Sequence, residues 1–121
     1  MTNGVAVELY DLTRVYGSVK ALDGLSLRGQ AIAENIANAN TPSYRPVRVS
    51  FERALRDAAG RGVTEIAAVR PKLATDAASG DELRLDLEVA NAAQTAQRYG
   101  ALADILNRQL QLDGLAITGN G

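Results

Sequence analysis

Cysteine and histidine are both absent from the sequence. Their absence excludes a disulfide framework, a thiolate nucleophile and any metal site that depends on imidazole ligands. A glycine-rich phosphate loop is missing as well. Asp86 and Glu88 stand two residues apart, so their carboxylates would not share one face of a helix. The sequence therefore predicts no catalytic residue, no cofactor and no metal, and the chain is not expected to be an enzyme.

Aromatic residues are scarce, at 4% of 121 residues, although hydrophobic residues make up 46%. Much of this apolar content is alanine, which buries little area per residue. A deep globular core is therefore not expected. Thin helices that bury apolar stripes against other helices fit this composition better, in a chain long enough for one small domain.

Neither sign of charge dominates, because 13 Lys and Arg residues stand against 14 Asp and Glu residues, for a net charge of −1. No basic stripe with interleaved aromatics appears, so no nucleic-acid partner is expected. No apolar run approaches the roughly 20 residues of a membrane span, so no direct span is expected. The first residues, MTNGVAVELYDL, lack the basic region, apolar core and cleavage site of a secretory signal.

Apolar residues at helical spacing predict a long amphipathic helix over about residues 9–40, after a frayed start over residues 1–8. The pattern passes from one register into a second, heptad-like register through a step of three between Val19 and Leu22. Interior glycines, each about 1 kcal/mol less favourable than alanine, make this helix marginal alone. Gly29 would allow close approach of a partner helix. The registers are Leu9, Leu12, Tyr16, Val19 and then Leu22, Leu25, Gly29, Ile32, Ile36, Ala39.

Three asparagines within six positions mark the end of this helix. Asparagine is a mediocre helix former that tolerates the left-handed conformation in which many helices end. Pro42 removes a backbone donor and disfavours helical angles at the residue before it. The helix should therefore stop near Asn40 and the chain should turn, with hydrogen bonds from Asn35, Asn38 and Thr41. The predicted turn residues are Asn35, Asn38, Asn40, Thr41, Pro42 and Tyr44.

Residues 43–80 are polar, broken and poor in large apolar residues, so they are expected to order only against neighbours or to stay mobile. Alternation over Val47–Phe51 predicts a short strand, and Phe51–Ala59 could form a helical turn, which Gly60–Gly62 ends. A second strand is predicted over Val63–Val69, stopped by Pro71, with a loop over Ala77–Gly80. The basic side chains could contact acidic partner surfaces or simply be solvated; they are Arg45, Arg48, Arg53, Arg56, Arg61, Arg70 and Lys72.

The C-terminal segment, residues 81–121, predicts a second amphipathic helix. Ser79–Glu82 fits a capping box, and alternation of Leu83, Leu85 and Leu87 allows an extended stretch before the helix begins at Glu88. Gly114 and Gly119–Gly121 would end it. The apolar stripe is Ala92, Ala96, Tyr99, Ala103, Leu106 and Leu110, widened by Leu102 and Ile105.

These features predict a mainly α fold, in which the helices of residues 1–42 and 81–121 pair as an antiparallel coiled coil around an irregular, β-containing middle of residues 43–80. Alanine-rich stripes bury modest area, so the remaining apolar faces should pack on other subunits. An ordinary packing face within one protein, or a soluble helical adaptor that binds partner helices, would show the same stripes. The predicted packing positions are Leu22, Leu25, Ile32, Ile36, Tyr99, Leu102, Leu106 and Leu110.

The stretch IAENIANANTPSY, residues 32–44, resembles the N-terminal signature of bacterial flagellar axial proteins, which runs roughly IAxNIANxxTxGY. It departs at Ser43, where the family usually has glycine and where serine is less suited to a positive φ. Phe51–Leu55 resembles the Phe-Glu-x-x-Leu of the rod proteins. Near the other end, Leu83, Leu85, Glu88 and Val89 take the places of Val-Asp-Leu-Asp-x-Glu-Met, with Arg84 where an acid is usual, and Tyr99–Leu102 matches Tyr-x-Ala-Leu.

This resemblance implies a structural subunit of the flagellar basal-body rod, or another rod subunit of the same family. Such proteins pack side by side in a helical tube that passes torque and encloses the export channel. The implied partners are other rod proteins, further copies of the chain, and the ring and export-gate components at the rod base. The implied location is the periplasmic rod, reached through the flagellar type III apparatus without a cleaved signal.

Overall fold

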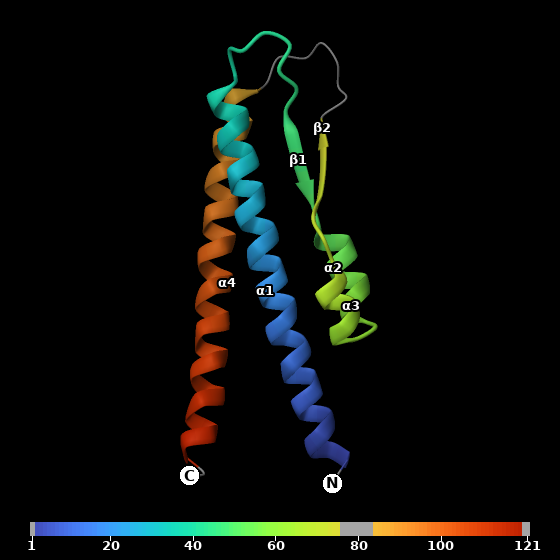
Figure 1. Ribbon diagram of the computed structural model, residues 1–121. Helices are drawn as coiled ribbons and strands as arrows, with labels where there is room; N and C mark the ends of the chain where they lie inside the picture. The colour runs from blue at the N-terminus through green and yellow to red at the C-terminus, as the bar shows by residue number, and fades with distance from the viewer. Residues whose placement is uncertain (1, 76–83, 120–121) are drawn as a thin grey trace.

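The computed structural model describes the backbone of residues 2–75 and 84–119, and the side chains of residues 12–75 and 84–112. The predicted fold class is confirmed: two long helices run antiparallel, and a two-stranded antiparallel sheet with two short helices lies between them in sequence (Figure 1). The elements are α1 (Thr2–Ala37), β1 (Val47–Ser50), α2 (Glu52–Ala59), α3 (Val63–Ala68), β2 (Lys72–Thr75) and α4 (Leu85–Gly119).

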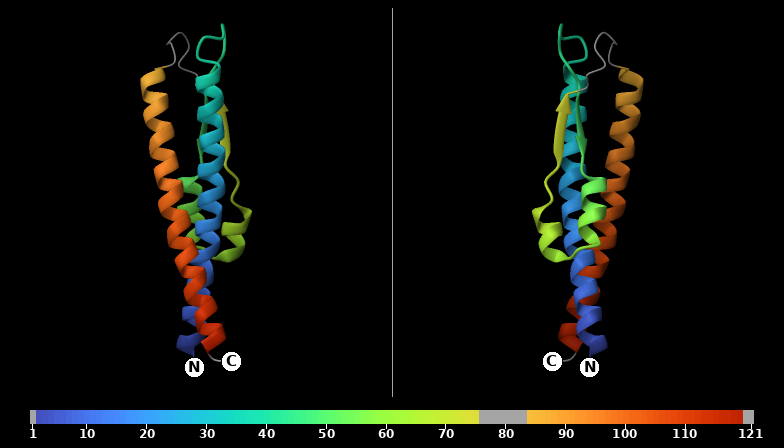
Figure 2. Two further views of the ribbon diagram at one scale, coloured as in Figure 1. Left: turned by 90° about the vertical axis from the view of Figure 1, so that its left-hand side faces the viewer. Right: turned by 90° about the vertical axis from the view of Figure 1, so that its right-hand side faces the viewer.

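α1 occupies the centre of the molecule. α4 packs along it, while β1, α2 and α3 also contact α1, so that one helix supports every layer (Figure 2). The first turn of α1 and the last turn of α4 lie at the same end of the pair (Figure 1). The connection between α1 and β1, together with the start of α4, lies at the opposite end.

α1 begins at Thr2, so the prediction of a frayed start over residues 1–8 is wrong. It ends at Ala37, and turns follow over residues 38–40. Backbone N–H groups of Asn38, Ala39 and Thr41 donate to the carbonyls of Glu34, Ile36 and Asn38 at 3.0, 3.2 and 3.0 Å. These bonds satisfy carbonyls that the last helical turn leaves unpaired, which is why the helix can stop before Pro42.

α4 begins at Leu85, three residues before the predicted start, so Leu85 and Leu87 are helical and the proposed extended stretch is wrong for them. Asp86 and Glu88 in the first turn suit the positive end of the helix dipole. The helix continues through Gly114 to Gly119, so Gly114 does not end it. The predicted loop over Ala77–Gly80 and the capping box lie outside the described residues.

The middle segment is more regular than predicted. β1 forms at the predicted place and pairs with β2, with Val47 opposite Thr75 and Ser50 opposite Lys72. The strand predicted over Val63–Val69 is wrong, because Val63–Ala68 forms α3. Val63 and the fully buried Ile66 are three residues apart, and this spacing places them on one helical face.

The core lies where β1 and the start of α2 meet α1. Leu25, Ala31, Val49 and Phe51 form one buried cluster. The Phe51 ring lies directly against the backbone of α1 at Gly24, where an added Cβ would approach ring atom Cδ1 to 2.5 Å. Gly24 therefore belongs to the core because it leaves room for the ring.

We expect Gly24→Ala to lower the free energy of unfolding by about 1–3 kcal/mol, since the methyl group would push the Phe51 ring out of place. Gly17→Ala is the matched control, because a Cβ there meets nothing within 4 Å and should stabilise α1 by about 0.5–1 kcal/mol. Urea unfolding followed by circular dichroism measures both. Equal and favourable shifts for the two variants would contradict this account of the core.

Candidate assembly site

Asn35, near the end of α1, is completely buried and uses every polar atom of its side chain. Its Nδ2 donates to the carbonyl of Val47 at 3.0 Å and to Glu88 Oε2 at 3.4 Å. Its Oδ1 accepts from the backbone N–H of Val47 at 2.9 Å and from the Tyr44 hydroxyl at 2.8 Å. One amide therefore joins α1, the turn, the first residue of β1 and the first turn of α4.

Glu88 is the acidic member of this group and is 1% exposed. Its Oε1 pairs with Arg48 Nη1, and its Oε2 accepts from Asn35. A buried carboxylate is stable only when its charge and lone pairs are satisfied in this way. We call Asn35, Tyr44, Val47, Arg48 and Glu88 the Asn35 cluster. It fixes where α4 begins relative to β1.

The remaining predicted turn residues lie on the outer side of this cluster. Asn38 Nδ2 donates to the carbonyl of Glu34 at 2.9 Å, and Thr41 Oγ1 donates to Asn38 Oδ1 at 3.2 Å. Asn40 and Pro42 are exposed. Ser43 has a φ of 64°, a conformation that glycine adopts at no steric cost and that serine rarely adopts.

The eight predicted packing positions divide into three levels of exposure. Leu25 and Ile32 are buried, and Leu102 packs against the core cluster. Leu22, Ile36 and Leu106 are half-buried. Tyr99 and Leu110 are 43% and 50% exposed, so about half of the surface of each side chain remains uncovered in the single chain.

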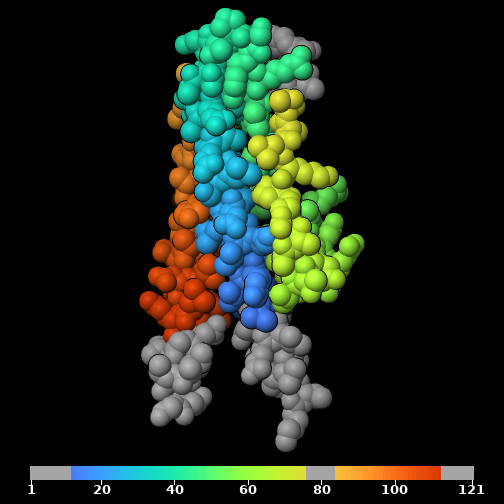
Figure 3. Space-filling view, viewed as in Figure 1, coloured from blue at the N-terminus to red at the C-terminus, as the bar shows by residue number. Residues whose placement is uncertain are grey.

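An apolar groove of about 360 Å³ lies between α1 and α4, lined by residues that include Leu25, Gly29, Ala92, Ala96 and Tyr99. A Cβ on Gly29 would meet nothing within 4 Å, so this glycine borders the groove and does not bring α1 and α4 together. Figure 3 shows α1 exposed along a strip between α4 and the β1–β2 side of the molecule. Further exposed apolar residues on the two helices are Leu12, Tyr16, Val19, Leu85, Leu87, Val89, Ile105 and Leu112.

A second group of polar contacts surrounds Arg28, and sequence analysis did not predict it. Arg28 donates to the carbonyl of Val49 at 2.8 Å through Nη2, pairs with Glu52, and lies 5.0 Å from the centre of the Phe51 ring. Its partners are 21 to 24 residues away, so helical periodicity gives no sign of them. Burial tends to raise the pKa of Glu52, but hydrogen bonding and charge from Arg28 bring it below its ordinary value.

No helix in the described part of the chain is long and apolar enough to cross a membrane. Within the same residues, no three Asp or Glu side chains come together as a metal site would require. A comparison of the chain with family models finds no match, and a comparison with curated proteins finds none either. The flagellar resemblance therefore rests on the motifs described above.

Loss of the Asn35 side chain should have a large effect. We expect Asn35→Ala to lower the free energy of unfolding by about 3 kcal/mol or more, because it leaves the Val47 N–H unpaired and removes a donor to the buried Glu88. Asn38→Ala is the control, since it removes exposed bonds within the turn and should cost about 1 kcal/mol or less. Urea unfolding of both variants distinguishes them, and similar losses would contradict the central role of Asn35.

The charge of Glu52 provides a test of the Arg28 group. Because its pKa in the folded chain is lowered, its contribution to stability is present above its ordinary pKa of 4.5 and is lost as pH falls through the folded value. Arg28→Gln removes the guanidinium hydrogen bond and the positive charge that lower the pKa of Glu52, whereas burial still raises it, so this pKa should rise above that of the unmodified chain. Carboxyl NMR titration measures it directly. Asp86, whose pKa is lowered by a hydrogen bond from Arg84, should titrate unchanged and serves as the internal control.

Proposed function

We propose that this chain is a structural subunit of the bacterial flagellar rod, with the proximal rod as its place in that assembly. The observation that carries the proposal is the position of the motif of residues 32–44 in the fold. Its Asn35 supplies the buried amide of the Asn35 cluster, and its Ser43 has the positive φ suited to the usual glycine of the family. The uninterrupted turn NIANANTPSY favours the proximal rod protein over its close paralogue.

The exposed apolar surface supports an assembling subunit. Tyr99 and Leu110 on α4, and Tyr16 and Val19 on α1, expose large apolar side chains along both helices. Exposed apolar surface, where it is contiguous, commonly marks a protein–protein contact. Subunits that repeat in a tube meet through two different faces of each copy, so each uncovered helix face can pack on a different neighbour. The same surface would suit a helical adaptor, which is the second candidate.

The proposed role is mechanical and non-catalytic. Rod subunits would place α1 and α4 beside the helices of neighbouring subunits, and the tube would pass torque and enclose the export channel. The partners would be other rod proteins, further copies of this chain, and components at the rod base. The subunit would reach the periplasmic rod through the flagellar type III apparatus without a cleaved signal.

The test is electron microscopy of basal bodies from a strain that lacks the gene, rescued by plasmids. We expect rings without rod, hook or filament in the deletion strain and full flagella after rescue by the unmodified gene. Rescue by Leu110→Asp should fail, because the aspartate would place a charge where the half-exposed Leu110 is proposed to contact a neighbouring helix. Gln111→Asp, at an exposed position on the same helix, should rescue.

Two results would overturn the proposal. Complete flagella in the deletion strain would remove the rod assignment and favour the adaptor. Equal rescue by Leu110→Asp and Gln111→Asp would remove the assignment of the α4 apolar surface as the contact. Circular dichroism of both purified variants ensures that each is still helical.

A further inference from the structure

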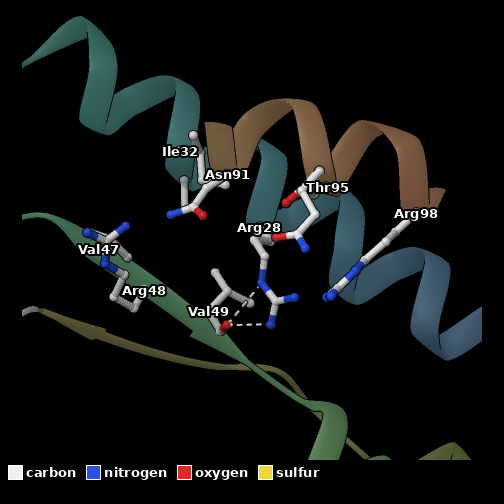
Figure 4. Close-up of a pocket in the computed structure, with 10 residues that line it drawn as sticks. Arg28, Ile32, Val47, Arg48, Val49, Asn91, Thr95 and Arg98 are labelled. Atoms are coloured by element: carbon white, nitrogen blue, oxygen red, sulfur yellow. Dashed lines mark hydrogen bonds between the residues drawn. The ribbon is translucent and has the colours of Figure 1, made fainter. Parts of the chain in front are cut away.

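A polar pocket of about 220 Å³ lies between α1, β1 and α4, and three arginines from these three elements line it. Figure 4 shows Arg98 reaching from α4 toward Arg28 on α1, with Arg48 on the β1 side. Asn91, Gln94 and Thr95 complete the polar wall along α4. We call this the arginine pocket.

The charges around the arginine pocket do not balance. Arg28 pairs with Glu52 and Arg48 pairs with Glu88. Arg98 has no ion pair or hydrogen bond with any residue in the described part of the chain, and the residues that line the pocket include no acid. One positive charge is therefore left over, on a side chain directed at a second guanidinium.

The donors that line the pocket suit a carboxylate. Arg28 uses Nε and Nη2 for Val49 and Glu52, and its Nη1 makes no hydrogen bond with a described residue. Arg98 offers a complete guanidinium, which matches the two oxygens of a carboxylate in a bidentate arrangement. The amides of Asn91 and Gln94 can donate further hydrogen bonds.

The size of the pocket limits what it can hold. A volume of about 220 Å³ lies below the roughly 300–1,000 Å³ of sites for small-molecule ligands and cofactors. A single acidic side chain is small enough to enter such a space. Nucleic acid is not favoured, because it requires an extended basic surface, whereas this chain has a net charge of −1.

We propose that the arginine pocket receives an aspartate or glutamate side chain of a neighbouring subunit. This inference rests on the proposed function, because it requires that the chain packs side by side with other proteins. The acidic side chain would supply the missing negative charge between Arg28 and Arg98. It would also set the register of the neighbour, which apolar helix faces alone leave poorly specified.

The first experiment measures carboxylate binding by the purified full chain, with glutarate as the probe. NMR signals of the Arg28 and Arg98 Nε–H groups should shift together along one saturable curve. In Arg98→Gln the affinity should fall by about tenfold or more, because a charge-assisted hydrogen bond is lost. Arg108→Gln, at another exposed arginine of α4, should bind like the unmodified chain. Independent or unsaturable shifts would overturn the proposal.

The second experiment asks whether the carboxylate comes from a neighbouring subunit. In the deletion strain, Arg98→Glu should fail to restore swimming, Arg98→Lys should restore it in part, and Arg108→Glu should restore it fully. Arg98→Glu should keep the helix content of the unmodified chain, because Arg98 is exposed and makes no hydrogen bond or ion pair with a described residue. If glutarate binds but Arg98→Glu swims normally, the pocket takes a free acid and the proposal is wrong.

The two proposals fail in different ways. If the deletion strain itself swims, the rod function fails. If the deletion strain does not swim but every Arg98 variant restores swimming, the rod function stands and the arginine pocket has no part in assembly.

Discussion

The arrangement of the whole chain depends on one buried amide. Asn35 pairs with both backbone groups of Val47 in the way that a neighbouring strand would, and it also contacts the carboxylate of Glu88. A buried backbone N–H or carbonyl without a partner would be strongly unfavourable, so the start of β1 can lie against α1 only with such a side chain present. The position of α4 follows, because Glu88 is held by Asn35 and by Arg48 of β1.

A second set of contacts, farther along α1, holds the rest of the middle segment against this helix. The Phe51 ring fits against Gly24, and Arg28 covers the ring while donating to the carbonyl of Val49. These contacts hold the end of β1 and the start of α2 on α1. Farther along, Lys20 donates to the carbonyl of Val69 beside α3. The chain has few aromatic residues, and its small core is built around one ring packed on one glycine. Polar side chains at its edge donate hydrogen bonds to backbone carbonyls.

Sequence analysis predicted the long helices well, because three- and four-residue spacing is a local signal that persists over many turns. It missed α3, where a strand was predicted over Val63–Val69, because a segment this short holds too few residues for its periodicity to distinguish a helix from a strand. β2 has no alternating pattern, and only its pairing with β1 defines it, with Val47 opposite Thr75, 28 residues later. The role of Glu88 depends on partners 40 and 53 residues away, which no local pattern contains.

The contacts between α1 and α4 differ in kind along their length. A buried hydrogen bond from Asn35 to Glu88 joins the two helices near the turn. Along the groove between the helices, small and apolar residues such as Leu25, Ala92 and Ala96 line both sides, and the attraction between apolar groups has no preferred direction. The directional contact near the turn therefore sets the register of α4 on α1, which apolar contacts along the groove do not specify.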